Sequence, residues 1–551
     1  MIKSPHLLAI AIAAAPLTAA FAQDSAPDNW FNLDPGSDGV AGVGTERVYG
    51  ELLEGREGSP VIVAIIDSGV DPDHEDLAGV MWVNEDETPD NGVDDDGNGY
   101  VDDVHGWNFI GGPDGRNVGP DTYEATRLYA ALDELYGERA DDDYEGLKRR
   151  EREQFDTYKE LRDLVEGKRA NLMNQAEQYE GMLQGFELIE SKLGEGFTVE
   201  DIAAYETEDP AEQMLLAMLT QFMSGGTTSE EIKSEIEGAY EYFANSANYG
   251  WNPDFDSRDI VGDDYDDVDE RYYGNNDVEG PDAFHGTHVA GIVAAARDNE
   301  LGMKGVADAA RIMSVRAVPD GDERDKDVAN AIRYAVDNGA KVINMSFGKG
   351  HAWNKRAVDE AVKYAAKNDV LLVHAAGNSS ENTDSTDNFP NDVYERRGLF
   401  KFLQKKYPDN WIEVGALSWE PGEDAVATFS NYGQTNVDIF SPGVDIYSTT
   451  PDGEYGDASG TSMASPVTAG VAALLRSYFP ELSAAEVRDI LLESGTSQRG
   501  QMVKLPAGRG SEPALVPFES LSVTGAVLNA PAAVQLAQQR TGKPGGRPAG
   551  A

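Results

Sequence analysis

Three residues that lie far apart in the sequence are of the types that perform nucleophilic catalysis. Asp67 follows the apolar run 61–66, His285 opens the segment His-Gly-Thr-His-Val-Ala-Gly-Ile, and Ser462 lies in Gly-Thr-Ser-Met-Ala-Ser-Pro-Val. A neutral serine hydroxyl attacks a carbonyl carbon usefully only when an imidazole accepts its proton and a carboxylate holds that imidazole in the correct tautomer. The three residue types therefore indicate acyl transfer, provided that the fold brings them together.

The three segments resemble the signature blocks of the subtilisin-like serine peptidases, the subtilases, which carry their catalytic residues in the order aspartate, histidine, serine. The stretch Asp71-Pro-Asp-His that follows the first block resembles the family as well. The resemblance implies that Ser462 is the nucleophile, His285 the base and Asp67 its orienting carboxylate. It also implies an endopeptidase that hydrolyses peptide bonds of proteins or peptides through an acyl-enzyme and needs no cofactor for its chemistry.

Further segments resemble the oxyanion and substrate sites of the same family. Asn378 ends the segment Ala-Ala-Gly-Asn and takes the place of the family's oxyanion donor, with the backbone N–H of Ser462 as the second donor. Ser346, Phe347 and Gly348 resemble the segment that pairs with an extended substrate as an added strand and forms one wall of the primary specificity pocket. Because the family often has a smaller aliphatic residue in place of Phe347, the shape of this pocket is left open.

An acidic loop after the first block is a candidate calcium site. Oxygen-bearing side chains at alternate positions are typical of calcium-binding loops, but His105 stands where an EF-hand has its glutamate. Either Asp102 or Asp103 would complete the shell, and a plain solvated loop is the alternative. The predicted ligands are Asp94, Asp96, Asn98 and Asp102. His288 lies three residues after His285, and we interpret it as structural because no third metal ligand of matching kind is evident.

The elements that must position these residues alternate between strand and helix. Several runs are apolar on both faces, as parallel strands covered by helices are, and the segments between them have helical spacing. The apolar runs are 61–66, 312–318, 342–345 and 370–375, and the helical segments are 327–338 and 355–367. This alternation predicts an α/β fold with a doubly wound, mostly parallel sheet, in which catalytic groups gather at the carboxyl ends of the strands.

A long segment of helical character separates Asp67 from His285, which are 218 residues apart, more than subtilases usually show. Its apolar residues recur at a seven-residue interval, which predicts a long amphipathic helix or two helices broken near Gly181 or Gly185. These residues are Tyr158, Val165, Leu172, Tyr179, Phe186 and Leu193. Shorter helices are expected over 210–223 and 229–243. The apolar stripe would either pack within the insertion or bind another chain.

These patterns divide the chain into parts. Residues 1–22 combine a positive start, an apolar stretch and small residues before Gln23, which predicts a signal peptide and export to the periplasm or the medium. The apolar stretch is too short for a membrane anchor. Residues 23–58 are predicted to form a polar, glycine-rich extension whose expected anchor is the segment Trp30-Phe31-Asn32-Leu33. A peptidase domain over 46–112 plus 251–535, a helical insertion over 113–250 and a flexible tail over 541–551 complete the chain.

Composition excludes several classes of protein. The chain has no cysteine, which rules out disulfides, thiolate metal sites and cysteine nucleophiles. Its formal net charge of −55 would repel phosphate backbones, so nucleic acid is not an expected partner. One alternative function is a non-catalytic binding or scaffolding protein that recognises a partner through the helical insertion. A lipase or esterase is a third, although the Ser462 segment lacks the Gly-x-Ser-x-Gly turn.

Overall fold

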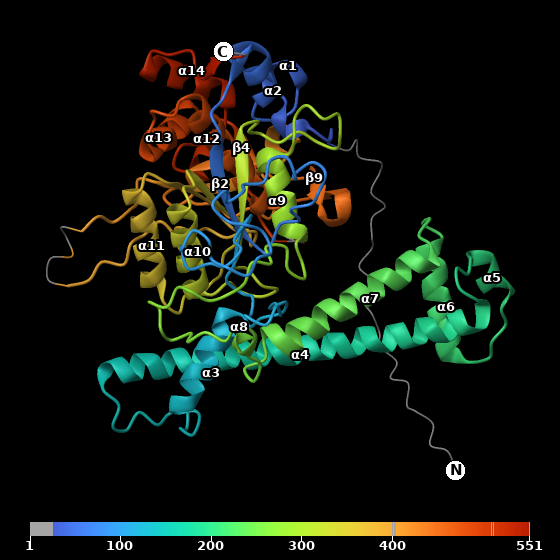
Figure 1. Cartoon of the computed structure of the whole chain (residues 1–551). Helices are drawn as coiled ribbons and strands as arrows, with labels where there is room; N and C mark the ends of the chain where they lie inside the picture. The colour runs from blue at the N-terminus through green and yellow to red at the C-terminus, as the bar shows by residue number, and fades with distance from the viewer. Residues whose placement is uncertain (1–25, 399–400, 402–403, 509, 511, 550–551) are drawn as a thin grey trace. The chain divides into compact units, whose positions relative to one another are not determined.

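The computed structural model describes residues 26–398, 401, 404–508, 510 and 512–549, and this part of the chain forms two compact units (Figure 1). The helical unit comprises residues 126–255, and the sheet unit comprises the described residues of 26–125 and 256–549. The predicted signal peptide over 1–22 lies outside the described residues. Within the described ranges, no helix has both the length and the apolar character needed to cross a membrane.

The sheet unit contains a nine-stranded sheet within the described residues, in the order β11-β14-β8-β7-β6-β5-β2-β4-β3. All neighbouring strands run parallel except β11 and β14. The predicted α/β fold with a mostly parallel sheet is therefore confirmed. The strands are β2 (Val61–Asp67), β3 (Gly106–Asn108), β4 (Ala310–Arg316), β5 (Val342–Met345), β6 (Leu371–Ala375), β7 (Trp411–Leu417), β8 (Ile439–Pro442), β11 (Thr496–Ser497) and β14 (Ala526–Val527).

Alternate residues of the central strand β2 face two different hydrophobic cores. Val63 and Ile65 belong to the core covered by α9, α12, α13 and α14, whereas Ala64 and Ile66 belong to the core covered by α10 and α11. Side chains along a strand point alternately to its two faces, so a run that is apolar throughout has helices on both sides. The helices are α9 (Phe284–Ala294), α10 (Asp325–Asp337), α11 (Lys355–Lys367), α12 (Thr461–Tyr478), α13 (Ala484–Ser494) and α14 (Ala530–Thr541).

Both ends of the described chain pack onto the sheet unit. Trp30 and Phe31 are fully buried in the core of α9 and α12, as expected for the anchor of the polar extension. Residues 541–549 differ from the predicted flexible tail, because β15 (Arg547–Pro548) pairs antiparallel with β1 (Arg56–Glu57). Gly546 N donates to Tyr478 O at 2.7 Å, and its positive φ lets the chain turn back there. A glycine-rich composition thus marks a close approach of backbone rather than disorder.

The remaining elements of the sheet unit are short. They are α1 (Pro35–Asp38), α2 (Thr45–Arg47), α8 (Arg258–Val261), β9 (Ile446–Thr450), β10 (Glu454–Ala458), β12 (Met502–Lys504) and β13 (Leu515–Pro517).

The helical unit is organised along one helix of 45 residues, which is unbroken at both glycines where an interruption was considered. Near its start, Phe155 and Tyr158 pack against Tyr136. Near its end, Phe186 and Ile189 join a core shared with the following helices. The predicted apolar stripe is therefore used for packing within the insertion. The helices are α3 (Glu124–Tyr136), whose first two residues belong to the sheet unit, α4 (Arg149–Leu193), α5 (Val199–Ala204), α6 (Pro210–Met223) and α7 (Ser229–Asn245).

Candidate active site

Asp67 and His285 meet where strand β2 ends beside the start of helix α9. Asp67 Oδ1 accepts a hydrogen bond from Ser68 N at 2.8 Å and lies 2.7 Å from His285 Nδ1. A carboxylate can only accept, so Nδ1 carries the proton and Nε2 is left as a proton acceptor. A Cβ at Gly286 would collide with the Gly69 carbonyl oxygen. The glycine after His285 therefore allows α9 to sit directly against the strand end.

The environment of this pair favours a protonated imidazole. Burial lowers the pKa of His285, but the charge of Asp67 and its hydrogen bond outweigh burial and raise the pKa above its ordinary value of 6.5. Asp67 is buried, whereas the His285 side chain keeps 38% of its surface exposed. The imidazole is thus held on a buried carboxylate and remains accessible from outside.

Ser462 lies in the first turn of α12, next to Asn378. Thr461 N and Thr461 Oγ1 both donate to Asn378 Oδ1 at 2.9 Å. Because these two donors hold the oxygen of the amide, its Nδ2 group is the one that faces away and can donate to a substrate. A Cβ at Gly460 would lie 3.4 Å from Asn378 Nδ2 and 3.6 Å from Ser462 Cβ. Glycine at this position keeps the space beside the hydroxyl and the amide open.

The predicted nucleophile, oxyanion donor and substrate wall line one cavity of about 310 Å³. Ser462, Asn378 and the segment 346–348 all contribute to it. Ser346 follows β5, Asn378 follows β6 and Asp67 ends β2, and these three strands are neighbours in the sheet. The site therefore lies at the carboxyl ends of adjacent parallel strands, where such sheets collect their functional groups.

One contact of the expected arrangement is not formed. In the described part of the chain no hydrogen bond joins Ser462 Oγ to His285, and Oγ donates instead to Ser346 O at 3.2 Å. The helices that carry the two residues, α9 and α12, pack against each other. Hydrogen bonds of a catalytic site are often long or misaligned without substrate and tighten in the complex. Transfer of the hydroxyl proton to the imidazole requires Ser462 Oγ to exchange its contact with Ser346 O for one with His285 Nε2.

Comparison with known proteins identifies the family to which this chain belongs. Residues 58–510 match the subtilase family. The chain belongs to the subtilase family. It is 42% identical over 228 residues to "Thermophilic serine proteinase" of Bacillus sp. (strain AK1), covering 41% of this chain and 49% of the relative. It is 39% identical over 217 residues to "Subtilisin DY" of Bacillus licheniformis, covering 39% and 70%. A solved structure described as a cold adapted subtilisin-like serine proteinase is 30% identical and covers 43% of this chain and 74% of that chain, with a TM-score of 0.34. This chain spans about half the length of the thermophilic relative.

The structure of this subtilase adds one buried residue that the sequence did not single out. Arg316 ends β4, lies opposite Asp67 in the register of the sheet and is 1% exposed. Its Nε donates to Ser68 O at 2.7 Å and its Nη2 donates to Val118 O at 2.5 Å. Burial lowers the pKa of Arg316 to about 10. The guanidinium thereby holds the turn that follows Asp67. An arginine within the run 312–318, which was predicted to be a buried strand, was the signal available in the sequence.

His288 is buried one turn after His285 and serves the backbone. Its Nε2 lies 2.9 Å from Ile446 O and 3.1 Å from Gly456 O, so Nε2 carries the proton and donates to both carbonyls. Burial lowers the pKa of His288 to about 4. The side chain is therefore neutral at ordinary pH, as suits the structural role that was expected.

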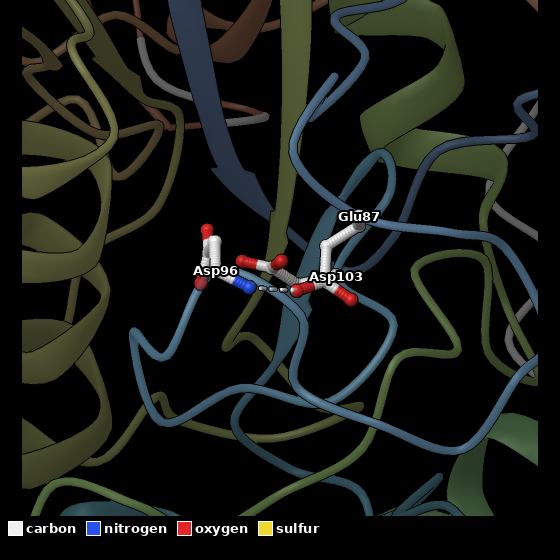
Figure 2. Close-up of side chains that lie close together, drawn as sticks. All are labelled: Glu87, Asp96 and Asp103. Carbon is white, nitrogen blue, oxygen red and sulfur yellow. Dashed lines mark hydrogen bonds between the residues drawn. The ribbon is translucent and has the colours of Figure 1, made fainter.

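The acidic loop brings together a different set of carboxylates from the predicted one. Asp94 accepts hydrogen bonds from Gly97 N, Asn98 N and Gly99 N, and Asp102 accepts from Asn91 N and Gly92 N. These two side chains stabilise the loop backbone and do not converge on a common point. The carboxylates that lie within 4.8 Å of one another, shown in Figure 2, are those of Glu87, Asp96 and Asp103. Of the four predicted calcium ligands, only Asp96 belongs to this group.

The chemistry of this group is compatible with a hard cation. Glu87 and Asp103 are buried, and carboxylate oxygens are the ligands that calcium prefers. Burial raises the pKa of Asp103 to about 6, although hydrogen bonds from Tyr334 and from Asn84 and Asn98 oppose the shift. Asn84 Nδ2 bridges Asp96 and Asp103 at 3.0 and 2.8 Å. A cation among these oxygens would favour their ionised forms.

Proposed function

We propose that this subtilase is a serine endopeptidase that hydrolyses peptide bonds of proteins through an acyl-enzyme. The observation that supports it most is the pairing of Asp67 with His285 Nδ1, which leaves Nε2 as a base at the strand ends where Ser462 and Asn378 line one cavity. A binding protein would have no need for a base, a nucleophile and an oxyanion donor in this arrangement.

The first half of the proposed reaction forms the acyl-enzyme. Ser462 Oγ attacks the carbonyl carbon of the scissile bond while its proton passes to His285 Nε2. Asp67 keeps Nδ1 protonated and stabilises the imidazolium. Asn378 Nδ2 and Ser462 N donate to the oxyanion of the tetrahedral intermediate. The imidazolium then gives its proton to the leaving nitrogen, the carbon–nitrogen bond breaks and the amine departs.

The second half of the reaction releases the acid. Water takes the place of the amine, and His285 Nε2 accepts a proton from it as its oxygen attacks the ester carbonyl. When the tetrahedral intermediate collapses, the proton returns to Ser462 Oγ and the carboxylic acid leaves. The main chain of 346–348 would hold the substrate as an added strand, next to the cavity that receives the side chain on the acyl side of the bond.

A serine-directed fluorophosphonate tests this proposal. We expect Ser462→Ala to abolish labelling and to lower kcat by about 10⁴–10⁶-fold. The matched control is Ser459→Ala, because Ser459 is exposed, lies three residues away and accepts a hydrogen bond from Asp445 N instead of lining the cavity. A folded wild-type protein that does not label, or proteolysis that survives Ser462→Ala, would favour an inert binding protein.

We also propose that the chain is exported. The support is the charged, apolar and small-residue order of residues 1–22. Amino-terminal sequencing of the protein recovered from the periplasm or the medium is expected to begin at Gln23. Recovery only from the cytoplasm with Met1 in place would contradict export.

We further propose a structural calcium ion at Glu87, Asp96 and Asp103, in place of the set predicted from sequence. The ion would neutralise carboxylates, two of which are buried, and stabilise the loop that follows β2. It would take no part in the acyl transfer.

A further inference from the structure

The cavity beside Ser462 has a mostly polar lining. Apart from glycines, only Phe347 and Ala375 among its lining residues carry apolar side chains. The others contribute hydroxyl, amide, carboxylate or amine groups. An apolar side chain is stabilised by transfer to apolar surroundings, and this cavity provides few of them.

The charges that line the cavity are unbalanced. Glu381 and Asp387 both line it, both are exposed, and within the described residues neither carboxylate takes part in an ion pair or a hydrogen bond. Lys349 is the one cation among the lining residues, all of which are described. Its Nζ is buried and lies 2.8 Å from both Glu124 and Asp325. The positive charge of Lys349 is therefore already compensated, and the cavity presents net negative charge.

Two of the segments that line the cavity, 346–350 and 386–388, are joined by backbone hydrogen bonds at Lys349 and Phe389. Lys349 N donates to Phe389 O at 2.9 Å, and Phe389 N donates to Lys349 O at 2.8 Å. Asn388 Nδ2 donates to Ala376 O at 3.2 Å, and a Cβ at Gly348 would lie 2.7 Å from Asn388 Oδ1. Asn388 Oδ1 is thus held close to Gly348, in the segment 346–350. In the described part of the chain this oxygen accepts no hydrogen bond, so it is available to a donor that enters the cavity.

From this lining we infer that the enzyme prefers to cleave after lysine or arginine. The inference rests on the proposed peptidase function, which places the side chain on the acyl side of the bond in this cavity. The methylene groups of a long basic side chain would lie along Phe347, and its N–H groups would reach Asn388 Oδ1 and the field of Glu381 and Asp387. An acidic side chain would be repelled, and a neutral one would leave these polar groups without a partner.

A matched peptide series tests the preference. The peptides share one sequence and differ only in the residue before the scissile bond, which is lysine, the neutral isostere norleucine, or glutamate. We expect kcat/KM for lysine to exceed that for norleucine by about tenfold at low salt, because two exposed carboxylates each contribute modestly. The ratio is expected to fall as salt is added, and glutamate is expected to be the poorest substrate.

Variants locate the preference in the cavity. In the double variant Glu381→Gln/Asp387→Asn the lysine-to-norleucine ratio is expected to fall to about one to two, since the opposing charges are gone. The control Glu423→Gln/Glu512→Gln removes the same amount of charge from two exposed residues that do not line the cavity, and it is expected to keep the wild-type ratio.

The outcomes separate this inference from the proposal on which it rests. Equal rates for lysine and norleucine in the wild type, or an unchanged ratio in the cavity variant, would overturn the basic preference and leave the peptidase proposal standing. Failure to cleave any peptide, together with failure to label with fluorophosphonate, would overturn both.

Discussion

Ion pairs occur in both units of the chain, but they lie at different depths. In the sheet unit, Lys326 is fully buried, with Asp263 and Glu270 both at 2.7 Å. In the helical unit, Arg149 pairs with Glu153 at 3.0 Å, and the two side chains are 94% and 63% exposed. A buried charge that loses its partner cannot be rescued by water, whereas an exposed one can. Ion pairs made of the same residue types are therefore expected to contribute very differently to the stability of the two units.

The buried pairs gather around the two connections to the helical unit. Asp121 and Glu124 precede the first connection, and within the sheet unit they pair with Arg324 and Lys349 at 2.8 Å. After the second connection, Arg258 pairs with Asp327 at 2.7 Å. The sheet unit therefore depends on residues that were predicted to belong to the insertion, since Asp121 and Glu124 fall within 113–250.

Two deletions of the insertion are expected to show the largest effect. Removing 127–254 keeps Asp121 and Glu124, whereas removing 115–254 leaves Arg324 and Lys349 buried without them. A short Gly/Ser linker suits the shorter deletion, because Thr126 Oγ1 donates to Gly250 O at 2.8 Å, and Gly250 is only five positions before Phe255, where the chain resumes. We expect the shorter deletion to melt within a few degrees of the parent, and the longer one to lose about 3–5 kcal/mol or more or to fail to fold.

Thermal denaturation measures the stability of the two deletion variants, and fluorophosphonate labelling measures whether their Ser462 remains reactive. Equal stability of the two proteins would contradict the role given to the buried pairs.

A single buried cation is expected to give the next largest effect. Lys326→Met leaves Glu270 without its cation and Asp263 with Arg258 alone, and it should lower the free energy of unfolding of the sheet unit by about 3 kcal/mol. Arg149→Met removes an exposed pair of the helical unit and should change the free energy by less than about 1 kcal/mol. Urea denaturation of the two variants compares them. Similar losses in both would remove the distinction between the units.

Calcium is expected to act on the sheet unit and not on the helical unit. Residues 126–255, all of them described, hold no group of three close carboxylates like that of Glu87, Asp96 and Asp103. At a calcium concentration of about 100 times the dissociation constant, binding would stabilise the sheet unit by about 2.7 kcal/mol. Differential scanning calorimetry with and without chelator measures this shift. In Glu87→Gln/Asp103→Asn the response should vanish, and a response that persists would place the ion elsewhere.

The two histidines of α9 are expected to differ in their response to pH. The pKa of His285 is raised above 6.5 by Asp67, so kcat/KM should fall about tenfold per pH unit below that pKa, as the base becomes protonated. Its contribution to stability has the opposite sense: it is present in full below pH 6.5 and is lost as pH rises through the folded pKa. His288, with a pKa of about 4, should stay neutral across this range.

Nitrogen-15 NMR of the imidazole rings resolves the two titrations. In Asp67→Asn the charge that raises the pKa of His285 is gone, so its midpoint should move to lower pH. A midpoint that does not move would mean that Asp67 does not set the charge of the base.

The regular elements were largely predictable because their patterns are local. The strand 342–345 and the helices 355–367 and 210–223 have the predicted bounds. Strands β7 and β8 were missed, since short apolar runs are ambiguous without their neighbours. The seven-residue repeat predicted α4, but not which helices would cover it, because partner choice depends on residues outside the repeat.

What the sequence determined by itself is the chemistry of the site. Asp67 ends a strand and Ser462 begins a helix, and both boundaries are encoded by the apolar runs and glycines around them. Only the tertiary structure decided which carboxylates group in the acidic loop, because backbone N–H groups compete for Asp94 and Asp102. The same holds for the charge of the cavity. Glu381 and Asp387 make it net negative because the charge of Lys349 is already compensated by Glu124, 225 positions earlier. Contacts across such distances follow from how the strands, helices and loops of the sheet unit pack, which no local pattern records.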